Sequence, residues 1–146
     1  MRPNLLLFYL FFTAALTADA QDFLDWGTLA NVEFEDHVSE DYGVPYQTAT
    51  FGEKISAKDG QTVAIKGYMI PLDAMGLSYV LSRNPNASCF FCGGAGPESI
   101  VKLNIQPKHV KRYKTDAVMI FRGTLRLNES NRHTFNYVLD EAEPVQ

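Results

Sequence analysis

Residues 62–72, with the sequence TVAIKGYMIPL, and residues 117–127, with the sequence AVMIFRGTLRL, decide the fold. Apolar side chains recur at every second position along much of both stretches, which is the pattern of a strand with one buried face. A single glycine, Gly67 or Gly123, interrupts each stretch, and a glycine inside a strand predicts a bulge or a sharp bend. Two long strands that bend in this way are typical of a small barrel whose strands turn corners.

Three shorter stretches extend the pattern to about five strands. Tyr79, Val80 and Leu81 form one strand candidate, residues 101–106 alternate cleanly between apolar and polar, and residues 135–139 alternate again. No long amphipathic helix is visible after residue 20. We therefore expect a mainly β protein, a small OB-like Greek-key barrel of about five bent strands, with a β-sandwich as the alternative.

The remaining residues divide into a signal peptide, an N-terminal arm and a C-terminal tail. Arg2, the apolar residues 5–12 and the small residues Ala18 and Ala20 predict a signal peptide over residues 1–20, cleaved after Ala20. Export to the periplasm or secretion follows, with no transmembrane span after cleavage. We expect residues 21–61 to form an irregular N-terminal arm and loop, in which residues 22–29 make a helical turn, residues 32–35 an edge strand and residues 36–51 a surface loop. The barrel core then covers residues 62–140, and residues 141–146 form a C-terminal tail.

Composition limits the classes of function. The chain has 146 residues, 13 Lys and Arg against 17 Asp and Glu, and two Cys. This length favours one domain, and the net charge of −4 gives no electrostatic reason to expect a nucleic-acid partner. Five carboxylates gather early in the chain, and because nothing fixes their spacing they indicate a solvated face rather than a cation site. They are Glu33, Glu35, Asp36, Glu40 and Asp41.

The most specific local motif is Cys89-Phe90-Phe91-Cys92-Gly93. Two thiols at this spacing can bind one metal ion or each other, and zinc knuckles use the same Cys-x-x-Cys-Gly arrangement. A tetrahedral zinc site needs about four ligands, so we expect His109 or His133 to complete a site that the two cysteines begin.

Two other roles for Cys89 and Cys92 stay open. An oxidising compartment favours a structural disulfide or a buried thiol pair. The third hypothesis is thiol–disulfide exchange by the two cysteines. An exchange catalyst usually places its first thiol at a helix N-terminus, however, and the glycines after Cys92 break any helix. No established catalytic motif is present elsewhere, which favours a binding role over an enzyme. The basic residues 108–114 are typical of a solvated connection between strands.

Several short motifs, in this order, resemble an exported bacterial family catalogued as domain of unknown function 3299 (DUF3299). They span residues 26–127 and are Trp26-x-x-Leu29, Val32-x-Phe34, the residues 67–72, Tyr79-Val80-Leu81, Cys89-x-x-Cys92 with Pro97-Glu98, and the residues 118–127. The resemblance implies a small β-barrel behind a signal peptide. It implies no established activity. The association of relatives with metal transport slightly favours the hypothesis that Cys89 and Cys92 bind a metal.

The sequence thus predicts an exported single-domain binding or accessory protein, with transition-metal handling, zinc for example, through the loop that holds Cys89 and Cys92. The alternatives are a thiol–disulfide redox protein and a protein-interaction module without metal. The predicted signal peptide and the resemblance to DUF3299 suggest an envelope transporter, or another envelope protein, as the partner.

Overall fold

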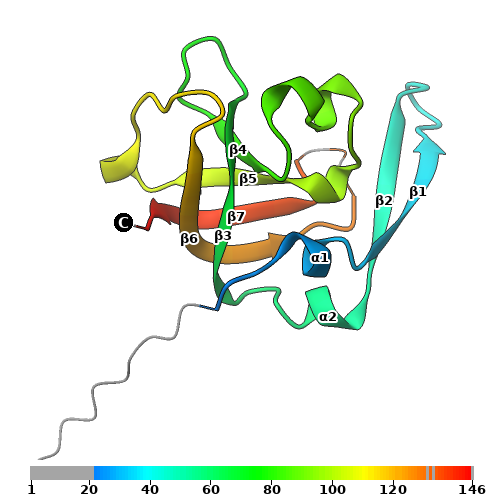
Figure 1. The fold of residues 1–146 in the computed structure, drawn as a ribbon. Coiled ribbons are helices and arrows are strands. Elements are labelled where there is room, and N and C mark those ends of the chain that lie inside the picture. The colour runs from blue at the N-terminus through cyan, green and yellow to red at the C-terminus, as the bar shows by residue number, and fades with distance from the viewer. Residues whose placement is uncertain (1–21, 131, 133, 146) are drawn as a thin grey trace, which may run out of the picture.

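Five strands of the computed structural model form a closed barrel, and the structure describes residues 22–130, 132 and 134–145 (Figure 1). Around the barrel the strand order is β3-β4-β5-β7-β6, with β6 returning to β3. Only β5 and β7 pair in parallel, and the other neighbours pair antiparallel. Counted from β3, this is the order 1-2-3-5-4-1 of an OB barrel, so the expected fold is confirmed. The barrel strands are β3 (Thr62–Pro71), β4 (Tyr79–Ser82), β5 (Ile100–Ile105), β6 (Val118–Leu127) and β7 (Tyr137–Pro144).

The barrel encloses the apolar side chains whose recurrence at every second position predicted the strands. The inward-facing residues are almost completely buried, and the outer faces of β3, β4 and β5 carry a second, smaller apolar cluster of Ile70, Val80 and Ile100. The inner set includes Val63, Ile65, Met69, Leu81, Val101, Leu103, Phe121, Leu125 and Leu139.

Gly67 and Gly123, the two strand glycines, have different structural roles. The register between β6 and β7 shifts between Arg122 and Thr124, so Gly123 lies at the irregularity that its presence predicted. Gly67 pairs with Met119 in an unbroken register, and it is needed for a close approach instead. A Cβ atom there would lie 2.7 Å from the Ser82 carbonyl oxygen, closer than any side chain tolerates.

The N-terminal part contains more regular structure than the sequence suggested. Residues 36–51 were expected to form a loop, but they include the strand β2 (Pro45–Phe51), which pairs antiparallel with β1 (Val32–Val38). The reason is that Tyr46, Thr48 and Thr50 favour strands and follow a turn at Gly43, whose φ is +63°. The resulting β1–β2 hairpin projects from the side of the barrel (Figure 1).

Short helices flank this hairpin and connect the barrel strands. α1 (Trp26–Leu29) confirms the helical turn expected over residues 22–29 for its last four residues, whereas Phe23 forms a parallel bridge with Ala64, and α2 (Glu53–Ser56) leads into β3. Short 3₁₀ helices occupy the loops around β5: η1 (Asn86–Ser88), η2 (Phe90–Cys92), η3 (Pro97–Ser99) and η4 (Pro107–His109). None of the helices in the described residues has the length and apolar character needed to cross a membrane.

Both ends of the chain differ from, or lie beyond, the expected division. The predicted signal peptide over residues 1–20 lies outside the described residues. β7 runs to Pro144, so residues 141–144, expected in a C-terminal tail, are part of the last strand. The strand continues because Ala142 is buried in the barrel core and pairs with Ile105.

Candidate functional site

The two cysteines lie on one tight turn between β4 and β5. Cys89 precedes η2 and Cys92 ends it, and the amide of Cys92 donates to the carbonyl oxygen of Cys89 at 3.1 Å. The side chains of Cys89 and Cys92 interact with each other, so the two thiols are neighbours. Gly93 closes the turn with a φ of +72°, which explains the glycine after Cys92. Both cysteines are free thiols.

The surroundings of the two thiols differ. Cys89 is fully buried, whereas Cys92 is exposed and its Sγ lies 3.2 Å from the carbonyl oxygen of Asn86. Desolvation, and then the neighbouring Cys89, raise the pKa of the Cys92 thiol above its ordinary value. An exchange catalyst needs an accessible thiol with a lowered pKa. This turn has the opposite arrangement, because the raised pKa of the exposed Cys92 favours its protonated form.

The structure does not bring His109 to the thiol turn. His109 lies in η4, which follows the end of β5, while Cys89 and Cys92 precede the start of the same strand. Its Nε2 instead lies 3.8 Å from the Glu143 carboxylate. His133 lies outside the described residues.

The described residues therefore offer two protein ligands at the turn, where a tetrahedral zinc ion needs about four. Within residues 22–130, 132 and 134–145 no group of three or more His, Cys, Asp and Glu converges on one point.

The basic residues 108–114 are partly engaged with the protein itself. Arg112 donates to the carbonyl oxygen of Met75 at 3.0 Å, and the Lys111 ammonium lies 5.3 Å from the centre of the Tyr113 ring. Lys108 faces Glu143 at 3.9 Å. These contacts agree with the interpretation of the stretch as a solvated connection.

Next to the thiol turn lies a groove that no sequence motif predicted. It is a hollow of about 310 Å³ between the loop of residues 83–99 and the β6–β7 loop of residues 128–136. We call it the aromatic groove and define it by Phe90, Phe135, Arg132 and the residues beside them. Its full lining is Phe90, Pro97, Ile100, Arg132, Thr134, Phe135 and Asn136.

Aromatic rings and cations meet at this groove. Phe90 and Phe135 pack on the outer apolar cluster of the barrel, and Phe91, whose side chain is 49% exposed, contacts both rings edge to face. The Lys102 ammonium lies 5.9 Å from the centre of the Phe135 ring. The groove thus lies over the outer apolar cluster of β3, β4 and β5, with Ile100 of β5 in its lining, and one of its walls is the β6–β7 loop. In OB barrels the second and third strands and the loop between the fourth and fifth carry the ligand.

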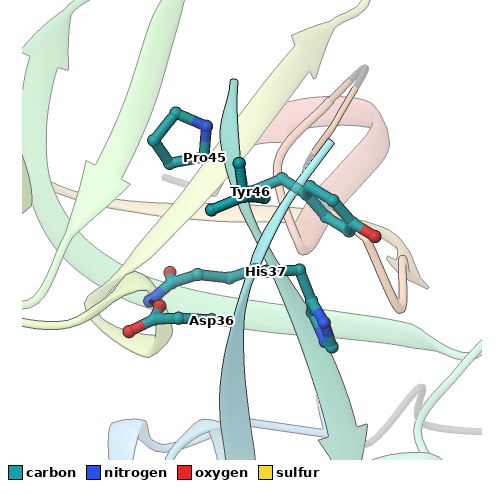
Figure 2. A pocket seen from close by; sticks show the side chains of 6 residues that line it. Asp36, His37, Pro45 and Tyr46 are labelled. Atoms are coloured by element: carbon teal, nitrogen blue, oxygen red, sulfur yellow. Dashed lines mark hydrogen bonds between the residues drawn. The ribbon is translucent and has the colours of Figure 1, made fainter. Parts of the chain in front are cut away.

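A second hollow, of about 540 Å³, lies on the β1–β2 hairpin. In Figure 2 the rings of His37 and Tyr46 extend to one side of the ribbon, while Asp36 and Pro45 lie on the other. The two rings stack with their centres 5.2 Å apart, and the Arg132 guanidinium lies 4.8 Å from the Tyr46 ring. Arg132 therefore lies between the two hollows. No sequence motif predicted this contact, because Tyr46 and Arg132 are far apart in the chain and meet only through the fold.

Comparisons with known proteins extend the fold assignment. No protein-family model and no curated protein matches this sequence. Among solved structures, the chain is similar to a DUF3299 family protein from Pseudomonas aeruginosa PAO1, with a TM-score of 0.53 and 16% sequence identity over 87% of this chain and 97% of that one. At this identity the likeness shows a shared fold. The structural neighbour thus comes from the same family, DUF3299, that the order of motifs in this sequence resembles.

Proposed function

We propose that the protein is an exported single-domain binding or accessory module whose ligand-binding surface is the aromatic groove. One observation carries the proposal: Phe90, Phe91 and Phe135 gather, with Lys102 and Arg132 beside them, on the barrel face through which OB domains bind ligands. The export part rests on the sequence of residues 1–20 alone.

The chemistry of the groove suits an anionic ligand with an apolar, planar part. Phe91 presents an exposed aromatic surface for stacking. The Arg132 guanidinium has five N–H donors and the Lys102 ammonium has three, so both can bind a carboxylate, sulfonate or phosphate at the rim.

Two fluorescent probes that differ mainly in charge test this proposal. We expect the groove to bind 8-anilinonaphthalene-1-sulfonate, which carries a sulfonate, more tightly than N-phenyl-1-naphthylamine, which is neutral. Phe91→Ala should weaken both probes several-fold, because it removes the stacking surface. Arg132→Gln should weaken only the sulfonate. Met75→Ala, at another exposed apolar residue, is the control and should change neither. Unchanged binding of both probes in Phe135→Ala, which removes a ring that lines the groove, would show that the groove is not the site.

As a second candidate, we propose zinc binding at the thiol turn, with an envelope transporter or another envelope protein as the partner that exchanges the metal. The supporting observation is the pair of reduced, neighbouring thiols on a Cys-x-x-Cys-Gly turn closed by Gly93. Because the described residues supply two ligands, the remaining ligands must come from His133 or from the partner.

Zinc titration of the reduced protein, followed by metal analysis, tests this second candidate. We expect stoichiometric zinc in the wild type and none in the Cys89→Ser, Cys92→Ser double variant. His133→Ala should lower the affinity if the chain completes its own site, whereas His109→Ala, at the far end of β5, should leave it unchanged. Metal-free wild-type protein in zinc-containing buffer would refute a site that this chain completes by itself, and zinc uptake by the double variant equal to that of wild type would refute the thiol turn as the site.

A further inference from the structure

The β1–β2 hairpin presents one strand edge without a partner. β1 pairs with β2 on one side, and among the described residues no strand pairs with its other side. β2 differs, because its outer edge meets the β6–β7 loop, where the amide of Ala49 donates to the carbonyl oxygen of Glu129. An unpaired edge is a template on which another extended chain can add as a strand.

Two hydrogen bonds establish which groups of β1 face outward. The amide of Ser39 donates to the carbonyl of Val44, and that of Gly52 donates to the carbonyl of Asn31, so residues 31 and 39 both point toward β2. Bonding direction alternates along an antiparallel strand. The backbone groups of the even-numbered residues therefore point outward to the free edge. These residues are Val32, Phe34, Asp36 and Val38.

The charge of the molecule is concentrated beside this edge. Residues 31–52 contain five Asp and Glu and no Lys or Arg, in a chain whose net charge is −4. All five carboxylates belong to exposed residues: Glu33, Glu35, Asp36, Glu40 and Asp41. Charged side chains commonly protect a free edge against a second copy of the same protein, because like charges then meet. The same charges attract a strand of opposite sign.

The tip of the hairpin offers apolar surface next to these charges. Val38 is 66% exposed, Tyr42 84% and Val44 57%. A hollow on the same hairpin has Asp36, Val38 and Pro45 in its lining, and Figure 2 shows Asp36 and Pro45 on one side of the ribbon. An added strand would place alternate side chains against this surface, so its apolar and basic residues can both find contacts.

We infer that the outer edge of β1 is a docking site for an extended, basic segment of a partner protein, which adds to the hairpin as a third strand. The free backbone groups supply the hydrogen bonds, and the carboxylates of the hairpin select the sign of the partner. This surface is separate from the aromatic groove, so the inference stands whether or not the groove binds a ligand.

A capped heptapeptide of alternating Lys and Val is the probe, with binding measured by fluorescence anisotropy on the full chain. We expect it to bind, and we expect a peptide of alternating Glu and Val to bind at least tenfold more weakly. Val38→Pro removes an outward amide without altering charge or the β1–β2 ladder. It should weaken the Lys peptide about fivefold to tenfold, the effect of one hydrogen bond. Val38→Thr keeps the amide and should bind normally.

Charge reversal supplies the second arm of the experiment. Glu33→Lys with Glu35→Lys should abolish the preference for the Lys peptide, whereas Glu141→Lys, an exposed position on β7, should preserve it. Tryptophan fluorescence and circular dichroism verify that each variant is folded. Equal affinity for the two peptides, or equal affinity in Val38→Pro and Val38→Thr, would overturn the inference. So would a wild-type dimer that Val38→Pro dissociates, because the edge would then be filled by a second copy.

Discussion

The hydroxyl group of Tyr79 connects three parts of the chain inside the protein. It donates to the carbonyl of Gly76 at 2.7 Å and accepts from the amide of Tyr113 at 2.8 Å, while the side chain is almost fully buried. Tyr79→Phe leaves both backbone groups without this partner. We therefore expect a loss of about 1–3 kcal/mol in the free energy of unfolding, measured by urea denaturation. Tyr42→Phe, at an 84% exposed tyrosine, is the control and should lose nothing measurable.

At this scale the sequence identified the residue types but not their surroundings. The spacing of Cys89 and Cys92 was sufficient to predict a turn that brings two thiols together. It could not show that the first thiol is buried and the second exposed, because burial depends on how the loop of residues 83–99 packs on the barrel. Gly67 was predicted as a bulge or bend, yet its role is contact with the Ser82 carbonyl of another strand.

Among the secondary-structure elements, α1 depends on a charged cap. The Asp25 carboxylate accepts from the Thr28 hydroxyl and the Thr28 amide, both at 2.9 Å, and these bonds lower the pKa of Asp25 below 3.8. A carboxyl group with a lowered pKa in the folded state stabilises the protein above its unfolded-state pKa. That contribution is lost as the pH falls through the lowered value.

The pH dependence of Asp25→Asn tests this cap. The asparagine keeps a capping oxygen but not the charge. We expect wild type to be the more stable at neutral pH and the difference to shrink below pH 3.8, measured by urea unfolding at a series of pH values. A difference that does not change with pH would show that the charge of Asp25 plays no part.

We expect the thiol turn, η2 with Cys89 before it, to close as a disulfide under oxidising conditions. The side chains of Cys89 and Cys92 interact with each other, so exchange with oxidised glutathione should give an internal disulfide and two reduced glutathione molecules. We expect a mass loss of about 2 Da by intact-protein mass spectrometry, faster at higher pH because the pKa of Cys92 is raised. The gain in stability should be at most about 2 kcal/mol, because the loop is short.

Single variants test the disulfide prediction. Cys89→Ser and Cys92→Ser should both fail to lose mass, because each has one thiol. Accumulation of a stable glutathione adduct on wild-type Cys92 would mean that the buried Cys89 cannot reach it, and the prediction would be wrong.

The sequence predicted strands better than it predicted the segments between them. Along β6 every second residue from Phe121 to Leu125 is buried, so the two-residue period of its apolar side chains is visible. β2 was missed because only Ala49 of its seven residues is buried, and so its pattern carries little hydrophobic contrast. What defines β2 is its pairing with β1, which a local pattern does not record.

At the scale of the whole molecule, the topology brings together residues whose proximity cannot be predicted from composition. The aromatic groove needs Phe90 and Phe135, which are far apart in sequence and line one hollow because the β6–β7 loop folds beside the loop before β5. The five carboxylates of the hairpin were correctly recognised as a group. Their significance changed when β2 turned the predicted loop into a hairpin, because the charges then lie along an open strand edge.

The N-terminal segment and the barrel should unfold as one unit. The amide of Leu24 donates to the Ala64 carbonyl, the Trp26 indole donates to the Lys66 carbonyl, and the Tyr137 hydroxyl donates to the Leu29 carbonyl. Trp26 is the single tryptophan, so fluorescence reports this segment while circular dichroism reports the barrel. We expect the two signals to give the same urea midpoint, as two-state unfolding requires.

Tyr137→Phe sharpens this test, because its hydroxyl joins β7 to α1 across the core. The variant should lower both midpoints equally if the segment and the barrel are cooperative. A fluorescence midpoint that falls below the dichroism midpoint, in the wild type or in the variant, would mean that the segment detaches before the barrel opens. The edge of β3 around Ala64 would then be exposed in a partly folded state, and the cooperative account would be wrong.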